Sequence, residues 1–409
     1  MSIPFPRSAI SFIFSLVLMA DLPLAADAPG PDSWQAGVAS VVITPQEPMW
    51  MAGYAARDKP SEGTLQDLFA KALAIQDPDE NRVVIVTMDL IGVLTELREN
   101  VAARVEESYG LPPAALMLNA SHTHCGPEYR PRSGREEEAR AYQAFLEETL
   151  VTLVGQALDQ LAPADLACSR ARAGFAMNRR LLTDRGYRIR PNPDGPVDHD
   201  VPVLTATDPR GDLRAVLFGY ACHNTTLSFY QFCGDYAGYA QEYFEADHPG
   251  ATALFVTGCG ADQNPHPRRE VKYAQQHGRT LATAVEAAVT ANPQPLRGRL
   301  QYDLDTVLLD RAGGDQEPFP YPIQVFQFGD QLTLIALASE VVVDYSLRLK
   351  EELAGDALVW VAGYSNGYFG YIPSRRVLEE GGYEAGPWEP TVEDRIVDKV
   401  HEMVGELRK

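Results

Sequence analysis

Met117-Leu118-Asn119-Ala120-Ser121-His122-Thr123-His124-Cys125-Gly126-Pro127 is the most informative segment of the chain. Its first half is an apolar strand, and its second half is polar and ends in Gly-Pro, a pair that terminates strands. Residues two apart on an extended chain project to the same face, so His122 and His124 can enter one pocket. The pattern alone fits a pair of half-exposed histidines as well as a metal site. Because the chain has only 8 histidines, their pairing at a strand end favours the metal.

The flanking sequence alternates strand-like and helix-like segments. Apolar strand-like runs lie at 37–43, 70–76, 83–90, 116–120, 214–221, 253–256, 298–308, 323–328, 332–338 and 358–362. Apolar residues at helical spacing lie at 95–109, 136–160, 238–248, 270–291 and 340–353. Two polar stretches, 183–200 and 310–322, are expected to be exposed loops. The alternation predicts an α/β fold with a mixed β-sheet core flanked by helices.

The N-terminus and the composition bound the class of protein. Residues 1–28 have a positive start, a short apolar run and small residues before the expected cleavage point at Ala28. This layout predicts a signal peptide and a secreted or periplasmic product, without a transmembrane segment. The formal net charge of -21 argues against a nucleic-acid partner and leaves small-molecule substrates open. The oligomeric state is not determined by the sequence.

The chain has 5 cysteines and no CxxC motif. In an exported protein one or two disulfides can form, whereas the alternative is that the cysteines are small buried apolar residues. Cys125 and Cys259 lie beside glycines in polar turns, so a cysteine nucleophile is a further alternative.

Two later strand ends resemble the first. His223 follows an apolar strand and precedes Asn224-Thr225, and alone it fits a hydrogen-bonded core residue as well as a ligand. The strand 253–256 runs into a Gly-rich turn that contains Asp262, Gln263 and Asn264. Such a turn offers backbone N–H groups to a ligand, or is an ordinary tight turn.

Oxygen ligands come from the last third of the chain. Glu340 stands at the end of an apolar strand, where a carboxylate is costly to bury unless it is paired or bound to a metal. The following segment, 363–374, concentrates tyrosines among glycines and includes Tyr371. Such tyrosines usually pack or contact sugars and lipids, but a phenolate can also bind zinc.

These motifs resemble the neutral ceramidase family, over about residues 35–384. The most specific pieces are the HTH-Cys-Gly-Pro segment, His223 with its Asn-Thr neighbours, the strand ending in Glu340 and the spacing from Tyr371 to Tyr383. The resemblance implies the catalytic-domain fold of that family. It also implies a Zn²⁺ ion, whose ligands would correspond to His122, His223, Glu340 and Tyr371. The substrate-contacting groups would correspond to His124, Arg179 and Tyr383.

The chain departs from the family pattern at two places. The family has a catalytic serine in a Gly-x-x-Ser-Pro-Asn turn, whereas this chain has Gly260-Ala261-Asp262-Gln263-Asn264-Pro265. The chain also stops at Lys409, before the expected β-sandwich domain of the family, so residues 29–409 are expected to form a single zinc hydrolase domain.

The predicted function is zinc-dependent hydrolysis of an amide bond in an N-acylated substrate, such as a ceramide-like lipid. Zinc lowers the pKa of bound water to about 7, so attack on the amide carbonyl can proceed without the serine. We expect His124 or Tyr383 to stabilise the oxyanion and Asp262 to orient water or protonate the leaving amine. Gln263 and Asn264, with Arg179, are expected to bind substrate. The alternatives are an esterase, an N-acyl sugar or peptide amidase, and a non-catalytic zinc-containing binding protein.

Overall fold

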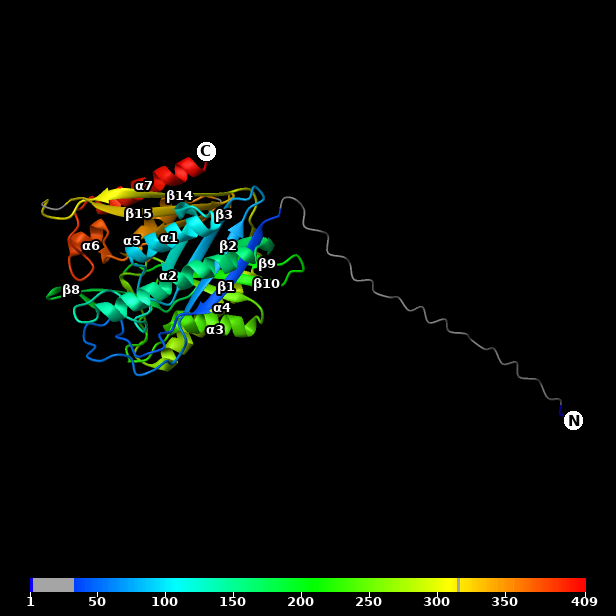
Figure 1. Ribbon diagram of the computed structural model, residues 1–409, viewed down its shortest axis with the longest axis horizontal. Coiled ribbons are helices and arrows are strands. Elements are labelled where there is room, and N and C mark those ends of the chain that lie inside the picture. Colours follow the sequence, from blue (N-terminus) through cyan, green and yellow to red (C-terminus); the bar gives the residue numbers. More distant parts are fainter. Residues whose placement is uncertain (3–32, 315–316, 356) are drawn as a thin grey trace.

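The computed structural model describes residues 1–2, 33–314, 317–355 and 357–409 (Figure 1). The expected signal peptide at 1–28 lies almost entirely outside these residues. No helix of the described part has the length and apolarity needed to cross a membrane.

Two five-stranded sheets form the centre of the fold. The first has the strand order β4-β3-β2-β1-β5, in which only β3 and β4 are parallel. The bounds of its strands are β1 Gln35–Val42, β2 Phe69–Gln76, β3 Arg82–Met88, β4 Leu116–Ala120 and β5 Ala162–Pro163. The second has the order β11-β10-β9-β6-β13. Its strands are β6 Asp165–Arg172, β9 Asp200–Thr207, β10 Leu213–Tyr220, β11 Thr252–Thr257 and β13 Gln294–Pro295.

Smaller sheets complete the β structure. A four-stranded sheet has the order β14-β15-β16-β18, with β14 Leu300–Leu309, β15 Phe319–Phe328, β16 Leu332–Leu337 and β18 Leu358–Ala362. A three-stranded sheet joins β12 Gln263–Pro265, β7 Ala176–Thr183 and β8 Gly186–Asn192. The strands β17 Glu340–Val341 and β19 Tyr371–Ile372 pair in parallel and align Glu340 with Tyr371.

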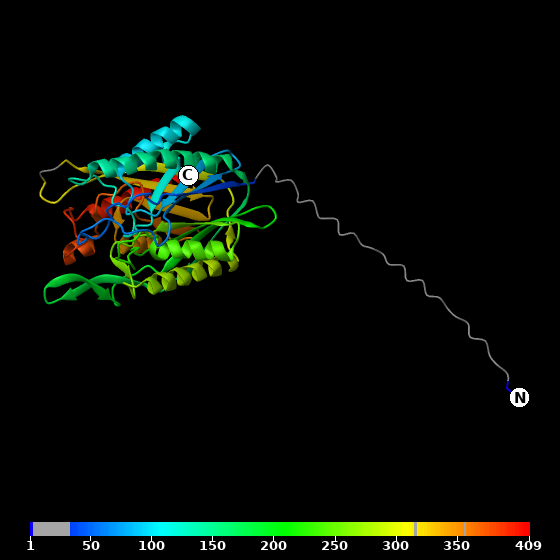
Figure 2. The same ribbon diagram turned by 60° about the horizontal axis from the view of Figure 1, so that its bottom comes forward.

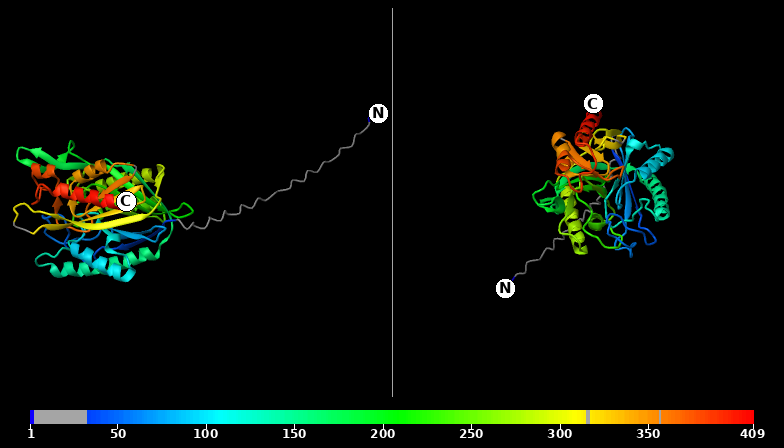
Figure 3. Two further views of the ribbon diagram at one scale, coloured as in Figure 1. Left: turned by 90° about the horizontal axis from the view of Figure 1, so that it is seen from above. Right: turned by 90° about the vertical axis from the view of Figure 1, so that its left-hand side faces the viewer.

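Helices cover the outer faces of the sheets. Helices α1 Thr95–Tyr109 and α2 Glu136–Asp159 lie on the side of the first sheet, and α3 Asp235–Asp247 and α4 Val271–Thr290 lie on the side of the second (Figure 2). The remaining helices are η1 Pro113–Ala115, α5 Val343–Glu352, α6 Arg375–Glu380 and α7 Val392–Leu407. Helices α5 to α7 gather with the four-stranded sheet on a third side of the molecule (Figure 3).

The sheets meet where β4, β11 and β18 end. Asn119 on β4 forms a bridge with Ser365, and Gly258 after β11 forms one with Ala362 at the end of β18. The amide of Asn119 also donates to the carbonyl of Gly363 at 2.8 Å. Three segments distant in sequence are therefore fixed side by side at one edge of the core, and the polar residues that follow these strands come together there.

The structure corrects some sequence expectations. The stretch 183–200 was expected to be a loop, but it contains β8, whose residues are mostly exposed and carry no apolar alternation. Glu340 was placed at the start of a helix, whereas it lies in β17 and α5 begins at Val343. All five cysteines are buried and free, so no disulfide forms. Burial also raises the pKa of the Cys125 and Cys259 thiols, which disfavours a thiolate nucleophile at either position.

Candidate metal centre and substrate cavity

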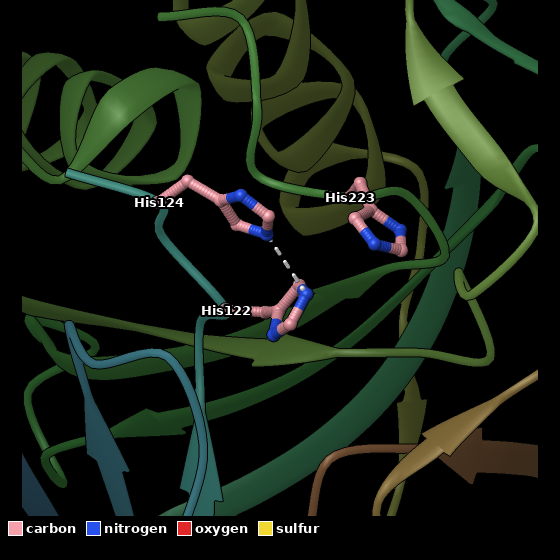
Figure 4. A group of neighbouring side chains, drawn as sticks. All are labelled: His122, His124 and His223. Carbon is pink, nitrogen blue, oxygen red and sulfur yellow. Dashed lines mark hydrogen bonds between the residues drawn. The ribbon is translucent and has the colours of Figure 1, made fainter. Parts of the chain in front are cut away.

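Three imidazoles converge at this junction of strand ends. His122 and His124 follow β4, and His223 follows β10, so the cluster joins the two large sheets (Figure 4). One ligand nitrogen from each ring lies within 4.8 Å of the others. His122 has a left-handed backbone with φ 58°, a conformation that costs energy in a non-glycine residue and is common at functional sites.

Glu340 completes the cluster from the other side. Its Oε2 lies 3.3 Å from Nε2 of His122 and 3.3 Å from Nε2 of His223. The side chain is 6% exposed. Both the Glu340 Oε2 and the His223 Nε2 are buried without a hydrogen-bond partner among the described residues. Buried polar atoms are normally paired, so unpaired atoms that face one another fit a site that binds a cation.

Backbone carbonyls orient two of the imidazoles. Nδ1 of His122 lies 2.6 Å from the carbonyl oxygen of Ile91, and Nδ1 of His223 lies 2.7 Å from that of Gly260. Because a carbonyl only accepts, each Nδ1 carries the proton and each Nε2 presents a lone pair to the cluster. This is the outer-shell arrangement of metal-binding histidines. Nδ1 of His124 has no partner, so His124 lacks this support.

The ionisation states suit a cation. Burial, followed by the nearby Arg179 guanidinium, lowers the pKa of His223 to about 3. Burial opposes ionisation of Glu340, but the adjacent His122 and His223 outweigh it and hold the pKa of Glu340 well below its usual value. A neutral imidazole and an ionised carboxylate at neutral pH are the forms that bind metals. The residues present therefore fit a metal ion.

Three tyrosines surround the cluster. The ring of Tyr364 packs 4.4 Å from that of His122, and its hydroxyl is buried without a partner in the described chain. The hydroxyl of Tyr368 donates to Glu340 Oε1 at 3.1 Å. Tyr371 is aligned with Glu340, and its hydroxyl accepts a hydrogen bond from Arg179 at 3.1 Å. Burial, with the neighbouring Glu340 carboxylate, raises the pKa of Tyr371 well above its usual value, so this phenol is neutral at pH 7.

Arg179 connects Tyr371 to the rest of the site. Its Nε donates to Glu384 at 2.8 Å, and its Nη1 donates to the Asn264 amide oxygen at 3.4 Å. Tyr383 lies beside them, with its ring 5.2 Å from that of Tyr371 and 63% of its surface exposed. Arg179, Asn264, Tyr371 and Tyr383 are thus brought together.

Asp262 and Gln263 are engaged elsewhere. The Asp262 carboxylate accepts from the backbone N–H of Val343, at the start of α5, at 2.9 Å, and from Asn178 at 3.2 Å. The Gln263 amide donates to the carbonyl of Ala221 at 2.7 Å, and its oxygen accepts from the backbone of Asp198. Both side chains are completely buried, and these bonds hold the Gly-rich turn against its neighbours.

A cavity of about 560 Å³ opens onto the cluster. Four residues of the predicted site line this cavity, namely His124, Glu340, Tyr371 and Tyr383. The sequence reasoning assigned no role to the other walls, which are Trp50, Met51, Gly53, Tyr54, Ala55, Arg57, Glu128, Arg130, Arg132, Ser133, Arg135 and Tyr368. Three arginines in this set, Arg130, Arg132 and Arg135, closely follow the HTH-Cys-Gly-Pro segment, and their density there was the available signal.

Fold and site together define a mixed α/β protein with a buried imidazole–carboxylate centre at its strand ends. A family model described as neutral/alkaline non-lysosomal ceramidase, N-terminal, matches residues 34–263. The chain belongs to this family of hydrolases.

Two solved structures resemble the chain. One, titled as a ceramidase complexed with C2, is 19% identical, covers 92% of this chain and 75% of the other, and has a TM-score of 0.80. The other is a neutral ceramidase from Pseudomonas aeruginosa, with 19% identity, the same two coverages and a TM-score of 0.79. At this identity the likeness shows a shared fold, and it confirms the expected α/β fold of the ceramidase type.

Proposed function

We propose that this protein is a zinc-dependent amidohydrolase that cleaves the amide bond of an N-acylated substrate such as ceramide. The observation that carries the proposal is the convergence of His122 Nε2, His223 Nε2 and Glu340 Oε2, with both imidazoles oriented by carbonyls. Nitrogen and carboxylate ligands with an open position are typical of catalytic zinc. Family membership and the two ceramidase structures support amide hydrolysis.

His122, His223 and Glu340 would hold the ion, and Tyr371 is the proposed fourth ligand. Zinc bound there supplies a Lewis acid that polarises a carbonyl and activates water. Arg179 keeps the Tyr371 hydroxyl in place through the bond at 3.1 Å. The charge of Arg179 also acts to lower the pKa of this phenol and so would favour the loss of its proton that binding to zinc would require.

His124 and Tyr383 are the groups proposed to act on the substrate. Both line the cavity, and Nε2 of His124 lies 3.2 Å from Nε2 of His122, so this imidazole stands beside the proposed metal, where it can donate to the developing oxyanion or to the leaving amine. Burial, with His122 and His223 nearby, lowers the pKa of His124 well below its usual value. Asn264 positions Arg179, whereas we assign Asp262 and Gln263 to holding the turn and α5.

Metal removal tests the proposal. We expect a strong chelator to abolish hydrolysis of ceramide and related N-acyl amines, and zinc to restore it. Glu340→Gln should lower the metal content measured by mass spectrometry together with activity. The control Glu245→Gln removes a carboxylate that pairs with Lys71, outside the cavity lining, and should retain the metal. Undiminished amide hydrolysis by metal-free protein contradicts the mechanism. Hydrolysis of esters alone, or one bound zinc without any hydrolysis, contradicts the amidase assignment.

We also propose that residues 1–28 are a signal peptide and that the mature enzyme, residues 29–409, is one secreted or periplasmic domain. The sequence layout supports this. N-terminal sequencing of protein recovered from the periplasm or medium should find a start near Pro29, and retention of the first residues in cytosolic protein contradicts it.

A further inference from the structure

The cavity that opens onto the imidazole cluster is rich in arginine. Arg57, Arg130, Arg132 and Arg135 line it, and among the described residues the carboxylates that line it are Glu340 and Glu128. The chain as a whole carries a formal charge of -21. A local excess of cations in an acidic protein is therefore a property of this cavity and not of the average surface.

Glu128 neutralises only part of this charge. Arg130 donates to Glu128 Oε1 at 2.6 Å, and Arg132 Nη2 lies 3.5 Å from Glu128 Oε2. One carboxylate thus serves two guanidinium groups.

The other two arginines have no carboxylate partner. Among the described residues, no Asp or Glu oxygen lies within 4.0 Å of the nitrogens of Arg57 or Arg135. The half-buried Arg57 donates to the carbonyls of Ala52 and Phe229, and its Nε is buried without a partner in the described part of the chain. Arg135 stacks on Trp50, with its Cζ 3.2 Å from the ring centroid. Such cations attract an anion more strongly in a cavity than in open water.

Arg57 is also close to the reactive cluster. Its Cζ lies 5.0 Å from the ring centroid of Tyr54, and that ring lies 4.8 Å from the ring of His124. One aromatic ring therefore separates the guanidinium from a proposed catalytic imidazole. An amide held at the cluster would have its neighbouring substituent near Arg57.

We propose that the N-acyl substrate carries an anionic group, a carboxylate or a similar oxyanion as in an N-acyl amino acid, which binds at Arg57 and Arg135. The inference rests on the proposed function and narrows its substrate class, because ceramide has no charge. Guanidinium groups bind carboxylates through charge-assisted hydrogen bonds, which are the strong class of hydrogen bond in proteins.

A matched pair of substrates tests the inference. N-acylglycine and N-acylglycinamide with the same acyl chain differ only in the charge of the terminal group. We expect the holoenzyme to prefer the carboxylate by at least about tenfold in kcat/KM, and Arg57→Gln or Arg135→Gln to reduce that ratio at least about fivefold, mainly through KM. Arg279→Gln is the control, because Arg279 also stacks on an aromatic ring, Tyr243 at 4.2 Å, but does not line the cavity.

Three outcomes overturn the inference. They are equal kcat/KM for the two substrates, a preference for the amide, or a carboxylate preference that survives when Arg57→Gln and Arg135→Gln are combined in one protein. Ceramide presented in neutral and in anionic vesicles provides a further arm. If vesicle charge accelerates ceramide hydrolysis and Arg57→Gln abolishes that acceleration, the arginines bind a lipid surface and the inference is wrong.

A binding measurement separates this inference from the proposed function. Ketomethylene analogues of the two substrates cannot be hydrolysed, and calorimetry gives their Kd values without turnover. A tighter Kd for the carboxylate analogue that depends on Arg57 supports the inference, even if no amide is cleaved. The absence of cleavage would contradict only the proposed function. Ceramide hydrolysis without any difference between the two Kd values contradicts only the inference.

Discussion

At the scale of single residues, the position of His124 depends on a glycine. Gly53 has φ 91°, and a Cβ built on it would lie 2.3 Å from Cγ of His124. Only glycine allows both this backbone and this contact. The structure therefore gives the physical reason for the glycine in Met51-Ala52-Gly53-Tyr54.

We expect Gly53→Ala to lower kcat/KM for an N-acyl substrate by about 10- to 100-fold, because a displacement of about 1 Å at a catalytic group costs that order of rate. Gly63→Ala is the control. Gly63 also has a positive φ, 144°, but its added Cβ would meet nothing within 4 Å. Steady-state kinetics compares the two variants, and equal kcat/KM values would show that the His124 contact is unimportant.

A buried carboxyl group gives a pH-dependent prediction at the same scale. Burial raises the pKa of Asp89 to about 6, above its value near 3.9 in an unfolded chain. The folded state therefore keeps this proton between about pH 4 and pH 6, and the contribution of Asp89 to stability falls as the pH rises through that window. Above about pH 6 Asp89 is ionised in both the folded and the unfolded state, so its contribution to stability no longer changes with pH.

Asp89→Asn removes this titration while keeping an acceptor for the backbone N–H of Phe69, which donates to Asp89 at 3.0 Å. We compare the unfolding free energy of the variant minus that of the wild type. We expect this difference to increase by up to about 3 kcal/mol between pH 4 and pH 7. Urea unfolding at both pH values measures this difference. A difference that is the same at pH 4 and pH 7 contradicts the prediction.

At the scale of elements, one glutamate holds β7 against the segment between α6 and α7. Glu384 accepts from Arg179 at 2.8 Å and from Arg180 at 2.6 Å, and its side chain is 1% exposed. Removing one member of a buried ion pair leaves the other charges without compensation. The same contact keeps Arg179 directed at Tyr371.

We expect Glu384→Gln to lower the unfolding free energy by about 3–5 kcal/mol, and to lower kcat because Arg179 loses its anchor. Glu148→Gln is the control, since Glu148 holds Arg104 through two bonds of 2.8 Å on an exposed helix surface, where ion pairs contribute little. Denaturant unfolding compares the variants. A similar loss of stability in both would show that burial of the Glu384 pairs is not the cause.

At the scale of the whole molecule, the proposed zinc ligands come from different sheets. His122 follows β4 of the first sheet, His223 follows β10 of the second, and Glu340 lies in β17 beside the four-stranded sheet. An ion bound by all three stabilises their association, because the unfolded chain does not form the site.

We expect zinc at 100 times its Kd to stabilise the metal-free protein by about 2.7 kcal/mol, seen as a rise in Tm by scanning calorimetry. His223→Ala should abolish the rise, whereas His401→Ala, which removes an exposed histidine that pairs with Glu352, should retain it. An equal rise in His223→Ala would place the ion elsewhere.

Local sequence patterns predict the elements with strong apolar periodicity. The expected bounds of α1, β4 and β18 agree with the structure, because a helical or strand-like apolar pattern is a local property. The same patterns did not predict β6 to β9 or the two C-terminal helices, α6 and α7. The exposed strand β8 is held by its backbone pairing with β7. Backbone pairing does not require an apolar alternation in the sequence, so β8 gave no such signal.

For the site, the sequence identified polar residues that follow apolar strands, and the structure brings His122, His223 and Glu340 together from among them. Asp262 follows a strand in the same way, yet its carboxylate accepts from the N–H at the start of α5. The cysteines likewise lie near the motifs and remain unpaired. Residue type and spacing are local, whereas the direction of a side chain and the identity of its partners depend on how distant strands pack. Those contacts arise from the packing of the sheets and helices in the folded chain.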